Sequence, residues 1–343
     1  MRAKGVGIAS LTIFASTLVS DSGGRPRKWG VKKIEGFHVS FQPACVTMDE
    51  RPRMEFKITH ITTYQYGNAA AEAYGEARLT PPDLPTQKVL KHRMTIEPAT
   101  RTSNYVDHFG NRVDFFSLPF RHQKLVVSSQ LLVETAPPIL PEESMQVTVQ
   151  EARQIFSSAL ADVFEYLQPT RIVRTGNNAV QWSRRYLRGD HTLLQGLTGL
   201  NEAIHDSFAY MKGVTENSTE LEVIWKNRKG VCQDFVHVAL SVLRTAGLPA
   251  RYVCGYIEAV APRRQAGKQR LVGAYATHAW VEVLVPGMLW VALDPPNRQW
   301  CNDRYIAVSY GRDASDAAPL RGTFKGSGGQ RLSAKVLMTR MNG

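Results

Sequence analysis

The spacing of the hydrophobic residues changes after the first strand-like runs of this chain, and the change separates two regions of different structure. In residues 56–66 apolar and polar side chains alternate, which is typical of a β-strand with one buried face. Further runs of this kind occur at 73–79, 89–97, 104–108, 112–118 and 125–134. At 149–167, 178–187 and 193–211 the apolar residues recur at helical spacing instead. We therefore expect an antiparallel β domain followed by a domain that contains helices.

Prolines and composition set the expected domain boundaries. Pro137, Pro138 and Pro141 indicate a linker at 137–145. This linker separates a β-rich domain at 54–136 from a second domain at 146–322, and residues 323–343 are expected to form a C-terminal tail. A chain of 343 residues that is 43% hydrophobic is long enough to bury a core in each domain.

Residues 1–53 lack regular patterning and are expected to lie outside both domains. An apolar run at 5–19 follows Arg2 and Lys4, as in a secretory signal, but no small-residue cleavage site follows it. The run is also too short for a membrane span. We expect a disordered extension or an over-long reading frame, which would leave the protein in the cytoplasm. A true targeting segment would instead lead to export.

Charge and cysteine content exclude several classes of protein. The net charge is +12, but the 42 Lys and Arg residues are scattered and form no long basic run beside aromatic residues, so nucleic acid is not an expected partner. The 4 cysteines are too few for a disulfide scaffold of this size, and the absence of C-x-x-C spacing excludes a zinc ribbon and a thioredoxin-type motif. No H-x-x-H, H-E-x-x-H or acidic calcium loop occurs, and we expect neither a metal nor a cofactor.

A reactive cysteine is predicted at the start of a helix. In residues 230–249 (GVCQDFVHVALSVLRTAGLP) the apolar side chains fall on one helical face, and the final Gly-Leu-Pro is typical of a helix end. Cys232 therefore lies in the first turn. There the unpaired backbone N–H groups and the helix dipole favour a thiolate, and the same groups can stabilise an oxyanion.

A base for this thiol is predicted on a neighbouring strand. Alternation in residues 275–284 (YATHAWVEVL) places His278 on a strand, and the run at 289–293 is an adjacent strand that ends at Asp294. Antiparallel pairing through the Pro286-Gly287 turn sets residue i opposite about 573 minus i, which brings Leu293 or Asp294 beside Ala279 or His278 and lets the carboxylate reach the imidazole. Cys232, His278 and Asp294 are thus the expected nucleophile, base and orienting acid.

These residues lie in segments that resemble a known family. GVCQDFVH, LRTAGLPARYVCGYI, THAWVEV, WVALDPPN and DRYIAVSYGRDASD are similar to the core of the bacterial transglutaminase-like proteins, a branch of the papain-like cysteine enzymes. Residues 54–136 resemble the β-rich N-terminal domain of its bacterial members. The resemblance implies an α+β fold, in which a cysteine-bearing helix packs on an antiparallel sheet. It also implies a catalytic triad, which falls on Cys232, His278 and Asp294.

Other residues near this site have expected supporting roles. Asp234 is placed to cap the helix rather than to catalyse. His237 is five positions after Cys232 and rotated by about 140° around the helix, so a structural role is expected. Gln233 and Tyr210 are alternative side-chain donors to an oxyanion, and Trp280 is expected beside the site. Among the remaining cysteines, Cys254 is expected to be a packed strand residue and Cys301 a peripheral thiol.

The expected function is thiol-dependent acyl transfer through a thioester, because a cysteine, a histidine and an aspartate with complementary roles are expected to lie close together. Taken singly, each of the three residues would more often be structural: a buried cysteine, a strand histidine and a turn aspartate. With water as the second nucleophile the protein is a cysteine protease or amidase acting on a peptide or protein, the reading that we favour. With a lysine amine it is a protein-glutamine transglutaminase. An inactive papain-like binding or scaffolding module is the alternative from another class.

Overall fold

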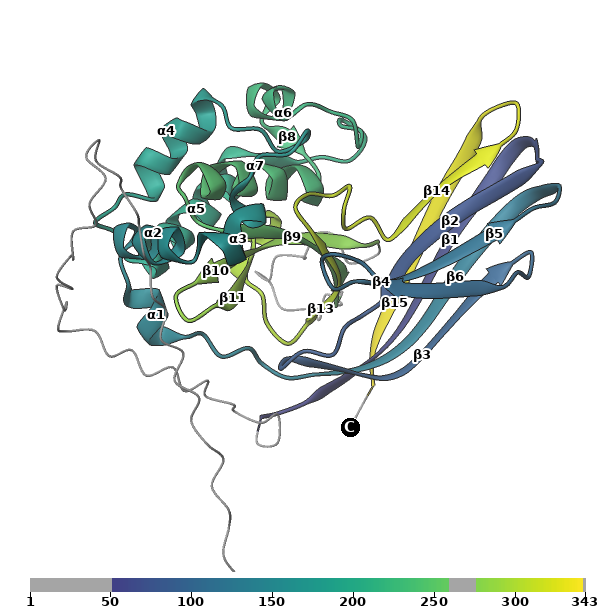
Figure 1. Cartoon of the computed structure of the whole chain (residues 1–343), viewed down its shortest axis with the longest axis horizontal. Helices are drawn as coiled ribbons and strands as arrows, with labels where there is room; N and C mark the ends of the chain where they lie inside the picture. The colour runs from purple at the N-terminus through teal and green to yellow at the C-terminus, as the bar shows by residue number, and fades with distance from the viewer. Residues whose placement is uncertain (1–50, 259–275, 342–343) are drawn as a thin grey trace, which may run out of the picture. The chain divides into compact units, whose positions relative to one another are not determined.

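The computed structural model describes residues 51–258 and 276–341 (Figure 1). Most of the segment 1–53 lies outside the described residues, namely residues 1–50 with Cys45 among them. Within the described ranges, the structure contains the antiparallel sheets and the helices of the expected α+β fold.

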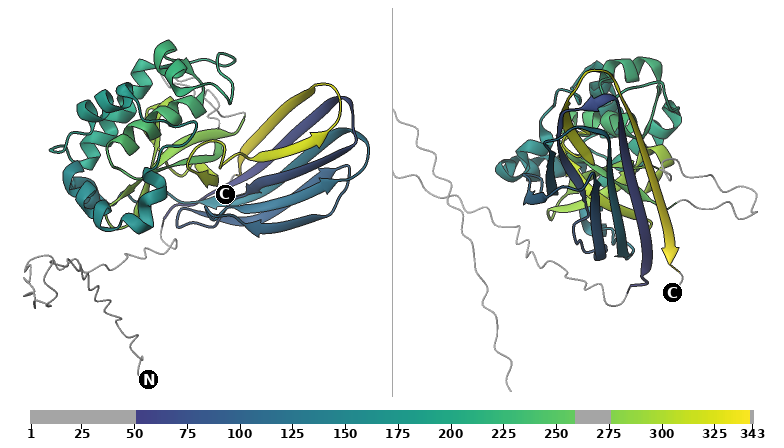
Figure 2. Two further views of the ribbon diagram at one scale, coloured as in Figure 1. Left: turned by 45° about the horizontal axis from the view of Figure 1, so that its top comes forward. Right: turned by 90° about the vertical axis from the view of Figure 1, so that its right-hand side faces the viewer.

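In the described part of the chain, the β domain is a sandwich of two antiparallel sheets (Figure 2). Their strand orders are β15-β1-β6-β3 and β14-β2-β5-β4. Side chains that alternate along the strands fill the space between the sheets, among them Tyr66, Phe116 and Val127. The bounds are β1 Met54–Ala70, β2 Glu72–Thr80, β3 Gln87–Glu97, β4 Thr102–Val106, β5 Arg112–Leu118, β6 His122–Thr135, β14 Leu320–Lys325 and β15 Gln330–Met341.

The end of the chain completes both sheets of the sandwich, so the prediction of a tail at 323–343 was wrong. Strand β14 pairs with β2, and β15 pairs with β1 over its whole length, up to Met341 opposite Glu55. In Figure 1 both strands are yellow and lie beside the early strands. Because β14 begins at Leu320, the second domain ends a few residues before the expected boundary at 322.

The second domain packs helices on an antiparallel sheet with the order β12-β11-β10-β9-β13. Figure 1 shows the helices gathered on one side of this sheet. The helices are α1 Glu142–Gln146, α2 Val149–Ser158, α3 Leu160–Leu167, α4 Asn177–Tyr186, α5 Leu193–Ser207, α6 Leu221–Asn227 and α7 Cys232–Thr245, with a 3-10 turn η2 at Pro295–Asn297. The sheet strands are β9 Ala250–Ile257, β10 His278–Val285, β11 Leu289–Asp294, β12 Gln299–Trp300 and β13 Tyr305–Gly311, and a separate parallel pair is formed by β7 Ala209–Tyr210 and β8 Lys229–Gly230.

Helix α7 is the central helix of this domain, and it packs on β9 and β10. Its residues from Asp234 to Arg244 are buried, because other helices surround the faces that do not meet the sheet. The helix ends as its sequence predicts: Gly247 has a φ of +75°, and the N–H of Leu248 donates to the carbonyl of Leu243 at 3.0 Å. The cysteine-bearing helix on an antiparallel sheet is therefore confirmed.

Strand β13 carries the contacts that join the β domain to the sheet. The side-chain amide of Gln87 exchanges two hydrogen bonds of 2.9 Å with the backbone of Ala307. Asn111 makes the same kind of pair with the backbone of Tyr310, at 2.8 and 2.7 Å. A buried apolar cluster that includes Phe56, Ile58, Leu131, Tyr256, Ile306 and Val308 lies beside them. These contacts bury backbone groups of β13 with their hydrogen bonds satisfied.

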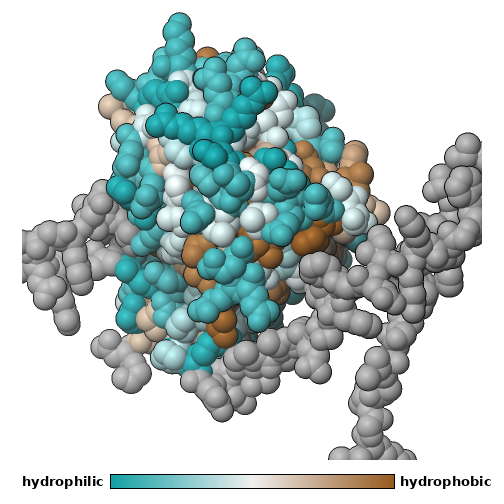
Figure 3. All heavy atoms as spheres, turned by 90° about the vertical axis from the view of Figure 1, so that its left-hand side faces the viewer, coloured by the Kyte–Doolittle hydropathy of each residue, from teal (hydrophilic) through white to brown (hydrophobic). Residues whose placement is uncertain are grey.

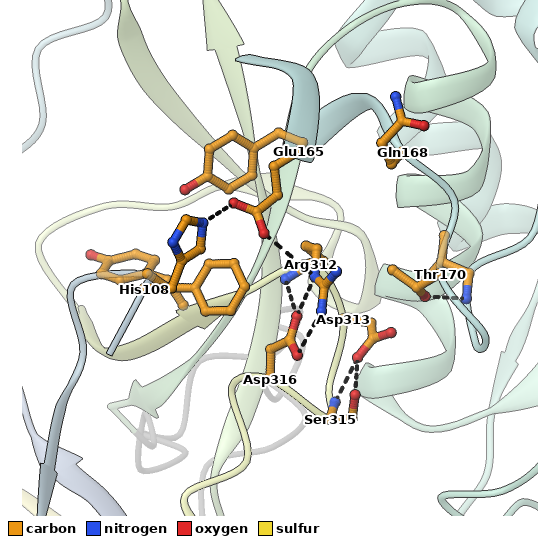
Figure 4. Close-up of polar contacts among 12 residues, drawn as sticks. His108, Glu165, Gln168, Thr170, Arg312, Asp313, Ser315 and Asp316 are labelled. Atoms are coloured by element: carbon orange, nitrogen blue, oxygen red, sulfur yellow. Dashed lines mark hydrogen bonds and ion pairs between the residues drawn. The ribbon is translucent and has the colours of Figure 1, made fainter. Parts of the chain in front are cut away.

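A polar network also ties the β4–β5 hairpin to the loop after β13 (Figure 4). Glu165 of α3 contacts His108 on one side and Arg312 on the other, and Arg312 in turn binds Asp316 at 2.8 Å. The N–H of Ser315 donates to Asp313 at 2.8 Å. The conformation of loop 312–316 is thus held by its own carboxylates and by α3.

The helical side of the second domain presents a mostly hydrophilic surface with small hydrophobic areas between the polar groups (Figure 3). Within residues 51–258 and 276–341, none of the helices has both the length and the apolar character needed to cross a membrane.

Candidate active site

Cys232 is the first residue of α7, and its side chain is partly exposed and forms no disulfide. The backbone just before it is held in place by Asp234, whose Oδ2 accepts the Val231 N–H at 2.8 Å and the Thr215 hydroxyl at 2.6 Å. These are the contacts of a helix cap. Gly230 allows this close approach, because a Cβ there would lie 2.4 Å from Asp234 Oδ2. Burial raises the pKa of Asp234.

His278 is the first residue of β10, and it lies between Asp294 and Cys232. Its Nε2 is 2.8 Å from Asp294 Oδ2. The Cys232 side chain lies close enough to the imidazole to raise its pKa. Nδ1 nevertheless closes no hydrogen bond of standard geometry within the described residues. Since Nε2 is engaged by the carboxylate, Nδ1 is the ring nitrogen that remains available to the Cys232 thiol.

Asp294 ends β11 and is completely buried. Besides His278, its Oδ2 accepts hydrogen bonds from the hydroxyl of Tyr305 at 2.6 Å and from Nδ2 of Asn297 at 2.7 Å. The side-chain amide of Gln299 donates to the same tyrosine hydroxyl. This arrangement fixes the carboxylate by several donors, which is what a buried negative charge requires.

The charge of Asp294 decides the protonation state of His278. Burial by itself lowers the pKa of His278, but the negative charge and hydrogen bond of Asp294, together with the Cys232 side chain, outweigh it and raise this pKa to about 10. The imidazole is therefore protonated on both nitrogens at neutral pH. A positive charge facing a thiol favours its ionised form.

The pairing of β10 with β11 differs by one residue from the sequence-based register. Val281 lies opposite Leu293 rather than Ala292. The hairpin loop has three residues, because Met288 adopts a left-handed conformation with a φ of +60° after Pro286 and Gly287. The predicted proximity of Asp294 to His278 still holds, since the carboxylate reaches the imidazole from the end of its strand.

Trp280 and Gly255 support His278 from the sheet. Gly255 of β9 is the strand partner of His278. A Cβ on Gly255 would lie 2.1 Å from the Ile306 carbonyl oxygen and 2.5 Å from the Trp280 ring. The Trp280 ring stands nearly perpendicular to that of Tyr305, with 5.4 Å between ring centroids. The absence of a side chain at 255 therefore lets the indole fill the space beneath the site.

Tyr210 and Gln233, the alternative oxyanion donors, lie in different surroundings. Strand β7 pairs with β8 so that Tyr210 is opposite Gly230, two residues before Cys232. The Tyr210 hydroxyl contacts both the side chain and the backbone of Cys232. Burial and the Cys232 side chain raise the pKa of Tyr210, and the backbone contact lowers it by less. Gln233 instead lines a cavity at the edge of the β sandwich.

His237 and Cys254 are buried away from these contacts. Nε2 of His237 accepts the N–H of Ala314 at 3.2 Å, and burial lowers the pKa of His237 to about 4. It is therefore a neutral acceptor at neutral pH. Burial raises the pKa of Cys254 to about 12, so this thiol stays protonated. In the described part of the chain, no group of three or more His, Cys, Asp or Glu residues is arranged to hold a metal ion.

Sequence reasoning missed three residues that contact the site: Asn297, Tyr305 and Thr215. Asn297 follows Asp294 by three positions in the DPPN segment, a spacing that could have suggested the contact. Tyr305 comes from β13, which is not adjacent to β11 in the sheet, and Thr215 from the loop before α6, and no local pattern singles them out.

Comparison with known proteins identifies the family. Residues 56–134 match the bacterial transglutaminase-like N-terminal region, and residues 180–295 match the transglutaminase-like superfamily. An uncharacterized protein of Mycobacterium leprae is 34% identical over 289 residues, which are 83% of this chain and 98% of the relative. The protein-glutamine gamma-glutamyltransferase of Pseudomonas aeruginosa is 34% identical over 113 residues, 32% of this chain and 17% of that enzyme.

Among solved structures, a "putative cysteine protease" from Cytophaga hutchinsonii has the same fold, with a TM-score of 0.68 at 19% identity. The match covers 85% of this chain and 92% of that one. The two family matches and the long match to the mycobacterial relative agree with one another. They show that this chain belongs to the bacterial transglutaminase-like family.

Proposed function

We propose that the protein is a thiol-dependent acyl-transfer enzyme whose substrate is a peptide bond or a side-chain carboxamide. The observation that carries this proposal is the buried imidazole of His278, held by Asp294 on one side and near Cys232 on the other. Membership of the transglutaminase-like family supports thiol chemistry. A nucleophile, a proton carrier and an orienting acid are the parts that such chemistry needs.

The first half-reaction forms a thioester. The Cys232 thiolate attacks the carbonyl carbon, and a tetrahedral oxyanion forms. The carbon–nitrogen bond then breaks while His278 donates its Nδ1 proton to the departing amine. Because the pKa of His278 is raised to about 10, the proton is already in place at neutral pH. Asp294 keeps Nε2 engaged, so the ring cannot turn this proton away from the sulfur.

The second half-reaction releases the acyl group. Neutral His278 takes a proton from water through Nδ1, the oxygen attacks the thioester, and the carbon–sulfur bond breaks to return the thiolate and a carboxylic acid. A primary amine in place of water would give a new amide and make the protein a transglutaminase. We favour water, and the similarity to the Pseudomonas aeruginosa gamma-glutamyltransferase makes amine transfer the second candidate.

Tyr210 is the side-chain oxyanion donor that we favour. Its hydroxyl contacts Cys232, whereas Gln233 lines the neighbouring cavity. A donor beside the attacking sulfur, together with backbone N–H groups of the first helical turn, can stabilise the charge that develops on the carbonyl oxygen.

A mass-based screen tests the chemistry. Peptides that contain internal glutamines are incubated with the full chain, with and without a lysine-containing acceptor peptide. Cleaved or deamidated peptides indicate hydrolysis, and a cross-linked product indicates amine transfer. Both products should disappear in Cys232→Ala and persist in Cys301→Ala, the matched control at another partly exposed cysteine. Equal turnover by Cys232→Ala would refute the proposal.

Thiol labelling separates the enzyme from an inactive binding module. A catalytic Cys232 should react with iodoacetamide below the ordinary thiol pKa of about 8.5, and His278→Asn should slow this reaction. A structural cysteine would be slow to react, whatever residue stands at 278.

A further inference from the structure

A cavity of about 470 Å³ lies beside the amino terminus of α7, a size in the range of ligand-binding pockets. One wall comes from the β sandwich, from its strands β1, β2, β14 and β15. The other wall comes from loops of the second domain, and it includes Gln233. Gln233 follows Cys232 directly, so the cavity reaches the residue next to the one that carries the thiol.

The sandwich side of the cavity is apolar and aromatic. Tyr66 and Phe116 line it and belong to the sandwich core. A Cβ at Gly75 would lie 2.3 Å from the Phe116 ring, so the glycine allows the ring to lie across this strand. Tyr74 and Leu332, also in the lining, are 43% and 56% exposed. Apolar side chains left uncovered around a cavity favour the binding of an aliphatic or aromatic group.

The charge in the lining is entirely positive within the described residues. Arg171 and Arg321 line the cavity, and no Asp or Glu does. Both arginines are exposed, and neither forms an ion pair within residues 51–258 and 276–341. The nearby acids of β2 are already engaged: Glu72 by Lys325 and Tyr74, and Glu76 by Arg78 and Tyr105. Two uncompensated guanidinium groups favour a carboxylate, which they can bind by paired hydrogen bonds.

The wall opposite the sandwich is held in a defined position. Ala314 and Ser315 line the cavity and belong to the loop that Arg312, Asp313 and Asp316 fix through their hydrogen bonds (Figure 4). The backbone N–H of Ala314 is also bound by His237, which lies on α7 below. The cavity wall is therefore tied to the helix that carries Cys232.

We propose that this cavity binds the substrate itself, as an extended peptide segment in which a carboxylate stands next to an aliphatic or aromatic side chain. The proposal depends on the function proposed above, since it assumes that the bound segment leads to Cys232. A peptide residue spans about 3.5 Å, so a chain bound beside Gln233 needs only a residue or two to bring a carbonyl to the thiol. The arginines would bind the carboxylate, and the aromatic wall the apolar side chain.

Alkylating peptides test this proposal without requiring turnover. Leu-Glu, Leu-Lys and Gly-Glu peptides carry either an N-terminal iodoacetyl group or a C-terminal chloromethyl ketone, so that either direction of binding is sampled. A Leu peptide with a free C-terminal carboxylate tests whether the acid must be a side chain. For every variant, the labelling rate at Cys232 is divided by the rate with small iodoacetamide, which removes differences in thiol reactivity.

In at least one series, we expect Leu-Glu to label about tenfold faster than Leu-Lys, the factor that two exposed charge pairs provide together. This preference should be lost in Arg171→Glu/Arg321→Glu. It should persist in Arg331→Glu, the matched control, because Arg331 lies between two lining residues of β15 and alternation turns it to the other face. Ser218→Trp, on an exposed loop of the lining, should slow both Leu peptides.

The outcomes separate the two proposals. Equal labelling by acidic and basic peptides in every series, or a preference that survives in the double arginine variant, overturns the cavity assignment. Iodoacetamide labelling that is slow and insensitive to His278→Asn overturns the catalytic function instead, even if the peptide preference remains. Thermal unfolding of each variant shows whether a lost preference reflects a lost fold.

Discussion

His278 Nε2 and Asp294 Oδ2 are 2.8 Å apart, and neither side chain has exposed surface. In such an environment a charge is not screened by water, and the charge of Asp294 favours the protonated form of His278. The pair therefore contributes both to the protonation state of the site and to the stability of the fold.

Replacing Asp294 by Asn should remove the charge that keeps His278 protonated. Burial, which lowers the pKa of His278, would then be opposed only by the Cys232 side chain, so the pKa should fall well below its value of about 10. Turnover should fall by about 10⁴-fold, as when the acid of a comparable triad is replaced by its amide. NMR titration of the imidazole measures the pKa directly. A pKa still near 10 in this variant would show that Asp294 is not its cause.

Replacing Tyr305 by Phe should weaken the support of Asp294. The hydroxyl donates to Oδ2 at 2.6 Å, and its loss leaves a buried carboxylate with one donor fewer. We expect the free energy of unfolding to fall by about 1–3 kcal/mol and kcat to fall with little change in KM. Tyr310→Phe is the matched control, because the Tyr310 hydroxyl has no hydrogen-bond partner in the described part of the chain. Similar losses in both variants would contradict this role.

Adding a methyl group at Gly255 should shift His278 from its position in the site. The new Cβ of Gly255→Ala would overlap the Ile306 carbonyl and the Trp280 ring, and the carbonyl belongs to a paired strand that cannot move away easily. Overpacking of this kind lowers the free energy of unfolding by about 1–3 kcal/mol. The value of kcat should also fall, because Gly255 is the strand partner of His278. Gly329→Ala has nothing within 4 Å of its added Cβ, so this variant should keep the free energy of unfolding and kcat near the wild-type values.

His60 should make the fold sensitive to acid. It is buried against Tyr256, with Nδ1 2.9 Å from the phenol oxygen, and burial lowers its pKa from 6.5 to about 4. Between these two pH values the unfolded chain binds the proton more readily than the folded chain, so stability is lost as the pH falls from 6.5 towards 4. The contribution of His60 is up to about 3 kcal/mol.

Urea unfolding from pH 7 to pH 4 checks this prediction by comparing the wild type with His60→Gln. The variant should be less stable at pH 7 but should lose less stability on acidification. Part of the wild-type loss should remain, since burial also lowers the pKa of His237 to about 4. An identical pH dependence in the two proteins would exclude His60 as a source.

Local sequence patterns predicted the elements that contain Cys232 and His278. The apolar face and the Gly-Leu-Pro end of 230–249 predict α7 with Cys232 in its first turn, and the alternation around His278 predicts β10. Such patterns depend only on neighbouring residues, because helices and strands bury one face at a fixed period. The same patterns predicted most strands of the sandwich. They did not reveal β15, because most of its side chains are exposed and its pairing with β1 is made by backbone groups that every residue has.

Only the tertiary structure decided which distant residues meet. A left-handed residue in a three-residue loop shifted the β10–β11 pairing by one position, which no hydrophobic pattern encodes. The contacts of Tyr305 with Asp294 and of Tyr210 with Cys232 join separate elements, as does the cavity between the sandwich and α7. The sequence thus determined the candidate site residues and the elements that carry them, and the topology determined their partners, because contacts between distant segments follow from how the elements pack.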